Sequence, residues 1–429
     1  MKQFSVVLIL STLVLGCGES SDPAVRKEQS TPATEETLYS LADKSLQEII
    51  AHSDGLLEKS SPFEVAGIEK DDFSIEEQQQ MSEYFMTARV KHLRIPSVKN
   101  PTYLFLPDVN ILTKEDAQKI LGFQGETLSL NGLVSLDQET AKVLSTFQGR
   151  HLYLSGLRSL DKDIATALSS FKGQLFLNGL KHLDIGTAEA LASSSSRDLS
   201  LNGVARLDKG AAAALSTFQG SVLSLNGLGS VDQETAKALS TFQGYALPLN
   251  GVKSLDQDTA AALSVFQGDY FYLDGVARLD KGTAEALSTF QGSVLSLDGL
   301  KRLDKGTAAA LSTFQGSGLS LDGLKHLDED TAGMLSNFQG GYLYVNGVVG
   351  LAGGVAESLA RFRGSYLYLN GVEHLAKDAA VMLSGFQGSS LSLNGLKRLD
   401  KGAAETLSTF TGYITLPYEL EEQVNQFKK

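Results

Sequence analysis

One unit of 24 residues recurs along most of this 429-residue chain, and it constrains the fold more than any other feature. Residues 221–244, SVLSLNGLGSVDQETAKALSTFQG, are one copy, and moving along the chain by 24 residues returns the skeleton L-x-L-N/D-G-L/V-x-x-L-D-x-x-x-A-x-x-L-S-x-F-x-G. Every step between copies is 24 residues except one of 23. A fixed period of this length is typical of a solenoid. The first leucine of each unit, or its substitute, falls at Leu104, Leu128, Leu152, Leu175, Leu199, Leu223, Leu247, Phe271, Leu295, Leu319, Leu343, Leu367 and Leu391.

Each unit begins with the pattern of a short strand followed by a turn. Leu223 and Leu225 alternate with variable residues, which is the period of a strand with one buried face. Asn226-Gly227 then predicts a tight turn, because Asn tolerates and Gly prefers a positive φ.

The second half of each unit has the pattern of a short helix. Asp232 is a predicted N-cap, since its carboxylate can accept hydrogen bonds from the free N–H groups of the first turn. Ala236, Leu239 and Phe242 follow at three-residue spacing and form one apolar stripe. Gly244 stands where a left-handed residue is expected to end the helix.

A single strand–turn–helix cannot bury its own apolar edges, so each unit needs neighbours. Stacked strands lie roughly 4.8 Å apart whereas helices need about 10 Å, so the stack must curve with its strands inside. This predicts an α/β solenoid with a curved parallel sheet inside and short helices outside. The right-handed β-helix is the competing solenoid, and the helical character of A-x-x-L-S-x-F argues against it.

The repeat resembles the leucine-rich repeat over about 102–416, and its spacing is most similar to the cysteine-containing subclass. The resemblance implies the α/β solenoid fold and a role as a protein-binding scaffold, although the fold alone names no ligand. An apolar residue stands where that subclass has Cys, which preserves the buried role. Examples of this position are Leu133, Leu157, Leu180, Leu228 and Val252.

The N-terminus has the pattern of an export signal. Residues 1–17, MKQFSVVLILSTLVLGC, have a positive start and an apolar run too short to span a bilayer. The end of this run resembles a bacterial lipobox, which implies that residues 1–16 are a lipoprotein signal peptide and that Cys17 is lipidated. Cys17 is the only cysteine, so no disulfide forms within the chain. An ordinary secretory peptide is the alternative interpretation.

The rest of the chain divides by composition. Residues 17–37 are polar and predict a flexible tether. Residues 38–100 predict a helical N-terminal cap, with a separate small domain as the alternative. Residues 101–416 are the solenoid of about thirteen repeats, and a fourteenth strand is expected at Ile414. Residues 417–429 form a charged, helical C-terminal cap or tail.

Three repeats depart from the skeleton. The fourth has Ser194 and Ser196 where Phe and Gly belong, which predicts a helix that ends early and packs loosely. The eleventh and twelfth have Ala352 and Ala376 at the N-cap position.

Catalytic and metal-binding patterns are absent from the sequence. The chain has no H-E-x-x-H, G-x-S-x-G, Walker or dinucleotide motif, so we expect no enzyme and no cofactor. The consecutive Asp274, Asp298 and Asp322 are compatible with a weak calcium site, but ordinary turn capping is the favoured interpretation, and no metal is expected. The other repeated Asp residues are expected N-caps, namely Asp137, Asp208, Asp232, Asp256, Asp280, Asp304 and Asp400. Repeated Asn residues are expected to form a hydrogen-bonding ladder, namely Asn131, Asn178, Asn202, Asn226, Asn250, Asn346, Asn370 and Asn394.

The strand positions beside the first leucine are variable and are expected on the concave surface. Serine is usual at the position after the first leucine, and aromatic residues stand out against it. We predict a partner-binding patch of Tyr342, Tyr344, Tyr366 and Tyr368, and a smaller patch of Tyr270 and Tyr272. Tyrosine stacking for strand stability alone is the alternative. A third aromatic group near the N-terminal end comprises Tyr103, Phe105, His151, Tyr153 and Phe176.

Together these features predict a non-enzymatic, exported bacterial envelope protein, anchored by lipid on Cys17 to the outer membrane or cell surface. Its concave face is expected to bind a protein or glycan, and the chain is expected to be monomeric. The net charge of −13 argues against nucleic acid as a partner. A structural spacer without a discrete ligand is the second hypothesis, and the near-identity of the sixth and ninth repeats supports it. An enzyme confined to residues 38–100 is a third.

Overall fold

The computed structural model describes residues 102–107 and 109–428, which fall into two units, Met1–Tyr153 and Leu154–Lys429. The expected signal peptide, Cys17, the tether and the 38–100 cap lie outside the described residues. In the described part of the first unit, three parallel strands alternate with two helices, and equivalent leucines are in register, Leu104 with Leu128 and Leu128 with Leu152. These elements are β1 (Tyr103–Phe105), α6 (Lys114–Ile120), β2 (Thr127–Ser129), α7 (Gln138–Leu144) and β3 (His151–Tyr153).

The second unit repeats the same strand–helix alternation eleven times over. Its main sheet is parallel, and each strand pairs with the strand one repeat away, so that Leu319 is opposite Leu343. The strands are β4 (Gln174–Phe176), β5 (Asp198–Ser200), β6 (Val222–Ser224), β7 (Ala246–Pro248), β8 (Tyr270–Tyr272), β9 (Val294–Ser296), β10 (Gly318–Ser320), β11 (Tyr342–Tyr344), β12 (Tyr366–Tyr368), β14 (Ser390–Ser392) and β16 (Tyr413–Thr415). Two short strands, β13 (His374–Leu375) and β15 (Arg398–Leu399), pair separately with each other.

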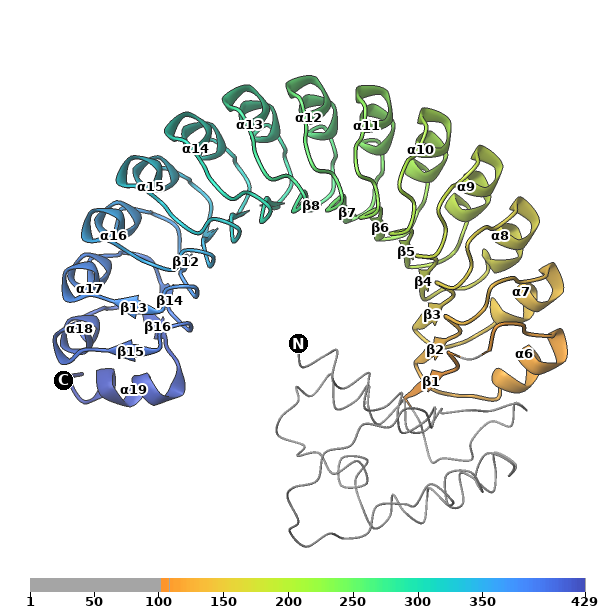
Figure 1. Cartoon of the computed structure of the whole chain (residues 1–429), viewed down its shortest axis with the longest axis horizontal. Helices are drawn as coiled ribbons and strands as arrows, with labels where there is room; N and C mark the ends of the chain where they lie inside the picture. Colours follow the sequence, from red (N-terminus) through yellow and green to blue (C-terminus); the bar gives the residue numbers. More distant parts are fainter. Residues whose placement is uncertain (1–101, 108, 429) are drawn as a thin grey trace, which may run out of the picture. The chain divides into compact units, whose positions relative to one another are not determined.

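The helices of the second unit lie on the outer side of its curve and the main strands on the inner side (Figure 1). This arrangement confirms the α/β leucine-rich-repeat solenoid, and the helix in each coil excludes a β-helix. The helices are α8 (Lys162–Leu168), α9 (Ile185–Ala192), α10 (Lys209–Ser216), α11 (Gln233–Leu239), α12 (Gln257–Leu263), α13 (Lys281–Leu287), α14 (Lys305–Leu311), α15 (Glu329–Leu335), α16 (Gly353–Ala360), α17 (Lys377–Ser384), α18 (Lys401–Leu407) and α19 (Tyr418–Asn425). In the described part of the chain, no helix is long and apolar enough to cross a membrane.

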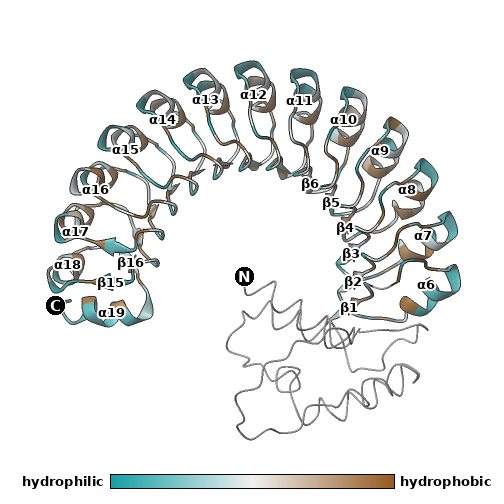
Figure 2. Ribbon diagram, viewed as in Figure 1, coloured by the Kyte–Doolittle hydropathy of each residue, from teal (hydrophilic) through white to brown (hydrophobic). Residues whose placement is uncertain are grey.

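The core runs through the coils between strand and helix. The helices of the second unit are hydrophobic toward the sheet and hydrophilic outward (Figure 2). Both strand leucines of a repeat are buried, as Leu319 and Leu321 show. At the C-terminal end, Leu420 and Val424 of α19 are buried as well, which gives the last coil an apolar contact.

A column of stacked phenylalanines joins successive coils. Their ring centroids are 6.0–6.2 Å apart and their planes lie within 9° of parallel. Because each ring contacts the ring of the next repeat, the column couples the stability of neighbouring coils. Its members are Phe218, Phe242, Phe266, Phe290, Phe314, Phe338, Phe362, Phe386 and Phe410.

The repeated glycines are required for a different reason from the one expected. Asn226-Gly227 forms the predicted turn, but neither Gly227 nor Gly244 has a left-handed φ, so the expected reason for these glycines is wrong. Instead, a Cβ on Gly227 would lie 2.3 Å from the carbonyl oxygen of Asn202, and one on Gly244 would lie 2.1 Å from Cζ of Phe242. Close packing between neighbouring coils leaves no room for a side chain at either position.

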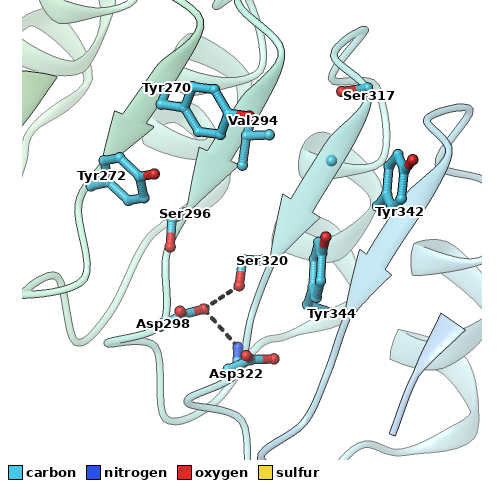
Figure 3. Close-up of a pocket in the computed structure, with 11 residues that line it drawn as sticks. Tyr270, Tyr272, Val294, Ser296, Asp298, Ser317, Ser320, Asp322, Tyr342 and Tyr344 are labelled. Carbon is cyan, nitrogen blue, oxygen red and sulfur yellow. Dashed lines mark hydrogen bonds between the residues drawn. The ribbon is translucent and has the colours of Figure 1, made fainter. Parts of the chain in front are cut away.

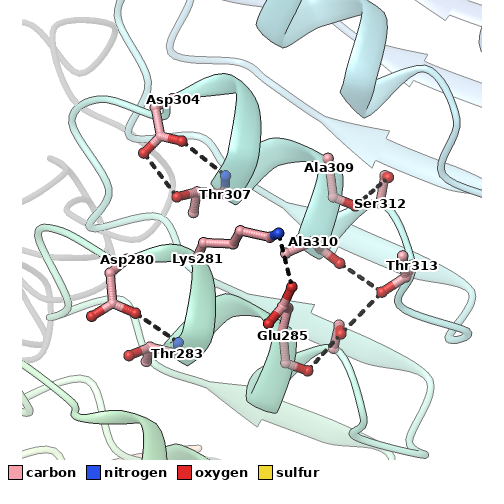
Figure 4. A network of polar contacts seen from close by, with 11 residues as sticks. Asp280, Lys281, Thr283, Glu285, Asp304, Thr307, Ala309, Ala310, Ser312 and Thr313 are labelled. Carbon is pink, nitrogen blue, oxygen red and sulfur yellow. Dashed lines mark hydrogen bonds and ion pairs between the residues drawn. The ribbon is translucent and has the colours of Figure 1, made fainter.

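The helix caps follow the prediction. In each of the seven helices expected to have an Asp N-cap, the carboxylate accepts a hydrogen bond from the third backbone N–H of the helix. Figure 4 shows two of them, Asp280 with the Thr283 N–H and Asp304 with the Thr307 N–H. Ala352 and Ala376 give α16 and α17 no side-chain cap, as expected.

The fourth repeat differs from its prediction. Its helix α9 is eight residues long, one more than most, so the expectation of an early end and loose packing is wrong. Ser194 and Ser196 are buried, and their hydroxyl groups hydrogen-bond to each other at 2.8 Å. Ser196 Oγ also donates to the carbonyl oxygen of Phe171 at 3.2 Å. A polar pair therefore fills the space that a phenylalanine ring occupies in the neighbouring repeats.

Candidate functional site

Two pairs of tyrosines face each other across the inner surface of the second unit (Figure 3). Tyr270 and Tyr272 project from β8, and Tyr342 and Tyr344 project from β11. Because side chains alternate along a strand, both members of each pair lie on the same face, opposite the buried leucine between them. The two pairs form the walls of a trough.

The floor of the trough is made of small residues from the two intervening strands. These are Val294 and Ser296 on β9, and Gly318 and Ser320 on β10. The trough has a volume of about 440 Å³. This volume lies in the range of small-ligand sites, and it is large enough to hold one or two side chains of a partner.

The tyrosines of the β11 wall stack on the tyrosines of the next strand, β12. The rings of Tyr342 and Tyr366 stack with centroids 4.7 Å apart, and those of Tyr344 and Tyr368 with centroids 4.4 Å apart. Burial first, and then the neighbouring Tyr368 and Tyr342, raise the pKa of Tyr344 to about 12. The stacking holds the rings of this wall in fixed orientations, and the raised pKa keeps Tyr344 neutral at physiological pH.

The wall on β8 has an additional tyrosine that the sequence analysis did not identify. Tyr245 precedes β7 and its ring centroid lies 4.9 Å from that of Tyr270. A hydrogen bond with Tyr270 is the main cause that raises the pKa of Tyr245 to about 12. The signal was present in the sequence, because the same position is serine at Ser221, Ser293 and Ser317.

A ladder of hydrogen bonds borders the trough where the strands end. The side-chain Oδ1 of each ladder residue accepts a hydrogen bond from the backbone N–H of the ladder residue in the next repeat, at 2.8–3.1 Å over nine steps from Asn178 to Asn394. The strand serine often adds a second bond, as when Ser320 Oγ donates to Asp298 Oδ1. This confirms the predicted ladder and explains why serine is usual beside the first leucine.

Asp274, Asp298 and Asp322 occupy three consecutive positions of this ladder, and Asp298 and Asp322 line the trough (Figure 3). Their Oδ1 atoms accept backbone hydrogen bonds as the asparagines do. Within residues 102–107 and 109–428, no group of His, Cys, Asp or Glu is arranged to hold a metal ion. The backbone hydrogen bonds that their Oδ1 atoms accept are the turn capping that the sequence analysis favoured.

The remaining aromatic residues lie elsewhere. Tyr103, Phe105, His151 and Tyr153 belong to β1 and β3 of the first unit, and Phe176 belongs to β4 of the second. The His151 ring lies 6.5 Å from that of Tyr153, and its Nδ1 is 3.0 Å from Thr127 Oγ1.

The sequence analysis treated Tyr270 and Tyr272 as a patch separate from that of Tyr342, Tyr344, Tyr366 and Tyr368. The structure makes the two patches opposite walls of one site. They come together because the two repeats between them have only small residues on the inner face, so nothing fills the space between the walls.

No family model matches the chain, and no curated protein matches it. Solved structures with a similar repeat arrangement include a chain of the Drosophila Toll–Spatzle complex, with a TM-score of 0.42, 13% identity, and coverage of 74% of this chain and 47% of that one. The glycosylated form of that complex gives a TM-score of 0.39, 13% identity, and coverage of 72% and 42%. A chain of the yeast Rad7–Elc1 complex gives a TM-score of 0.38, 14% identity, and coverage of 70% and 77%. This chain thus spans less than half the length of the two Toll chains.

Proposed function

We propose that this chain is a non-enzymatic binding scaffold whose inner face holds a protein partner in the tyrosine-walled trough. The observation that carries the proposal is the pair of facing walls over a floor of small residues. If the tyrosines served only strand stability, they would need neighbours to stack on, as Tyr342 has in Tyr366. The Tyr272 ring stacks on Tyr270 of its own strand, with centroids 6.0 Å apart, but on the next strand it faces only the small side chain of Ser296, which leaves that side of the ring available to a partner.

The chemistry of the walls fits protein recognition. Tyrosine contributes a large, rigid and amphipathic surface with little side-chain entropy to lose, and it is enriched at the centres of protein interfaces. A glycan is the other ligand that stacks on tyrosine rings, and it is an outcome of the test below.

The cellular setting is part of the same proposal. The lipobox-like sequence ending at Cys17 supports export and lipid anchoring at a bacterial outer membrane or cell surface, and residues 17–37 would tether the repeats to that membrane. The similarity to the cysteine-containing subclass of repeats belongs here too. Its characteristic position holds a buried apolar residue in this chain, for example Leu228.

A structural spacer without a discrete ligand is the second candidate. It is favoured by the near-identity of the sixth and ninth repeats, because selection for a specific surface diversifies repeats. The trough, by contrast, is built from repeats that differ from one another on the inner face.

The test is a pull-down from bacterial envelope extract with the full-length chain in mild detergent. The comparison is a variant with Tyr342, Tyr344, Tyr366 and Tyr368 changed to Ser, a residue that other repeats carry beside the first leucine. We expect a partner that the parent retains and the variant loses, with circular dichroism confirming that both are folded. If neither protein retains a partner, the spacer hypothesis is preferred; if both retain the same one, the binding site lies elsewhere.

A further inference from the structure

The inner surface of the second unit carries charge of one sign around the trough. The seven consecutive strand-and-turn segments from 245–251 to 389–395 contain four aspartates and no lysine, arginine or histidine. The aspartates are Asp269, Asp274, Asp298 and Asp322. The aspartates belong to the three consecutive segments 269–275, 293–299 and 317–323, so a partner with positive charge would be attracted to this part of the face.

These carboxylates lack the counter-charges that acidic groups have on the helix side. There, Lys209 pairs with Glu234 at 2.6 Å and Lys305 with Asp330 at 3.3 Å. In the described part of the chain, by contrast, no ion pair includes any of the four inner-face aspartates.

The aspartates at the trough also repel one another. Burial is the main cause that raises the pKa of Asp322, and the charges of Asp298 and Asp274 add to it. Asp298 is bonded through Oδ1 to Ser320 Oγ and to the Asp322 N–H. Its Oδ2 has no hydrogen bond to any of the described residues. A cation bound beside Asp298 would supply the missing partner and relieve the repulsion.

The walls offer the second half of a cation site. A guanidinium group gains energy when it stacks on the face of a tyrosine ring. Tyr272 and Tyr344 stand on the two sides of the trough, each two residues before a ladder position, so they lie at the same end as Asp298 and Asp322 (Figure 3).

We propose that the trough binds an arginine side chain of the protein partner, with its guanidinium stacked on the rings of one tyrosine wall and its N–H groups directed to Asp298 and Asp322. Arginine fits better than lysine, because its planar group stacks on rings and donates several hydrogen bonds in a fixed geometry. This inference rests on the proposed function and names the chemistry of the partner.

The repeats themselves supply a conservative variant. Asn202 Oδ1 accepts from Ser224 Oγ at 2.8 Å and from the Asn226 N–H at 2.8 Å, which are the two contacts that Asp298 makes. The double change Asp298→Asn and Asp322→Asn therefore removes two charges while both Oδ1 acceptors of the ladder are retained. Of the contacts of these two residues, it gives up the hydrogen bond that Asn346 Nδ2 donates to Asp322 Oδ2 at 2.9 Å. Asp232→Asn with Asp256→Asn is the matched control, since it removes two charges at helix N-caps, where Asn also caps well.

The binding test uses the full-length chain and saturation-transfer difference NMR, which detects weak ligands of a large protein. The probes are acetyl-Gly-Ser-Arg-Ser-Gly-amide, the same peptide with the neutral isostere citrulline, and the same peptide with lysine. We expect the arginine peptide to bind at least tenfold more tightly than the citrulline peptide, and the lysine peptide to lie between them. The Asp298→Asn and Asp322→Asn variant should lose this preference and the matched control should keep it.

Equal binding of the arginine and citrulline peptides would overturn the proposal, as would a preference for arginine that survives the loss of both aspartates. The pull-down separates this failure from failure of the proposed function. If the four-tyrosine variant loses a partner that the Asp298→Asn and Asp322→Asn variant still binds, that result would support a protein-binding trough but contradict the recognition of arginine. Binding of cellobiose or chitobiose that the four-tyrosine variant loses would make the trough a glycan site and overturn both proposals.

Discussion

Tyr344 and Tyr368 stack on neighbouring strands with their ring centroids 4.4 Å apart and their planes 9° from parallel. Burial raises the pKa of the Tyr344 phenol from 10.0 to about 12, and burial also raises that of Tyr368. The folded protein therefore favours the neutral phenol more strongly than the unfolded chain does. The stability that this difference provides is fully present below pH 10 and is lost as the pH rises toward 12.

We expect urea unfolding midpoints of the parent to fall between pH 10 and pH 12, and to fall less steeply in Tyr344→Phe, which has no proton to lose. Absorbance at 295 nm should show the corresponding difference, because one tyrosine that titrates late is missing from the variant. Identical pH profiles of the two proteins would contradict the role of Tyr344.

The ladder predicts a sharp difference between two substitutions at one position. Asp298→Ala leaves the Asp322 N–H and the Ser320 hydroxyl without their acceptor, and should lower the free energy of unfolding by about 1–3 kcal/mol. Asp298→Asn retains both hydrogen bonds and should change it by less than about 0.5 kcal/mol. Urea unfolding of both variants, monitored by circular dichroism, is the measurement. Equal losses would show that the charge, rather than the acceptor, stabilises this turn.

The phenylalanine column predicts that two positions of the fourth repeat depend on each other. In the regular repeats the ring lies against a glycine two residues later, as with Phe242 and Gly244. Ser194→Phe alone places a ring against the side chain of Ser196 and should destabilise by about 1–3 kcal/mol.

Adding Ser196→Gly should recover most of that loss, because the ring then has the space that it has elsewhere. A double-mutant cycle of the four proteins in urea measures the coupling, which we expect at about 0.5–3 kcal/mol. Additive effects would mean that the polar pair is not a replacement for the ring and its glycine.

The stacked core predicts that damage spreads beyond one repeat. Leu225 is fully buried between the strand and the helix, so Leu225→Asp places an unpaired charge in the core. Because each coil is stabilised by its neighbours, hydrogen exchange should accelerate in several repeats on both sides of β6. Leu225→Ala, which creates a cavity without charge, is the control and should give a smaller increase. Faster exchange confined to the coil of Leu225 would contradict the stacked core.

Most of the fold was predictable because every repeat carries the same local sequence pattern. The alternation of leucines around Leu223, the cap at Asp232 and the apolar stripe to Phe242 each have a physical meaning that does not depend on distant residues. The ladder of asparagines was predictable for the same reason, since a fixed period stacks equivalent positions.

The failures came from contacts between coils, which a single repeat does not reveal. Gly227 and Gly244 were assigned to backbone conformation, but their role is close approach to the neighbouring coil, at the carbonyl oxygens of Asn202 and Gly220. The buried pair of Ser194 and Ser196 also depends on the neighbouring coil. The trough was missed because it depends on what β9 and β10 lack, and not on any residue that stands out.

The trough has a property that follows from its construction out of copies. Its walls stand on β8 and β11, three strand spacings apart, which is about 14 Å. Their separation changes only in steps of one strand, since a 24-residue copy brings its own strand, ladder residue and helix. Duplication or deletion of one copy between the walls would widen or narrow the site by about 5 Å and leave every wall residue intact. In such a chain, the size of the ligand that fits is set by the number of repeats between the walls. The chemistry of the ligand is set by point substitutions in the wall and floor residues.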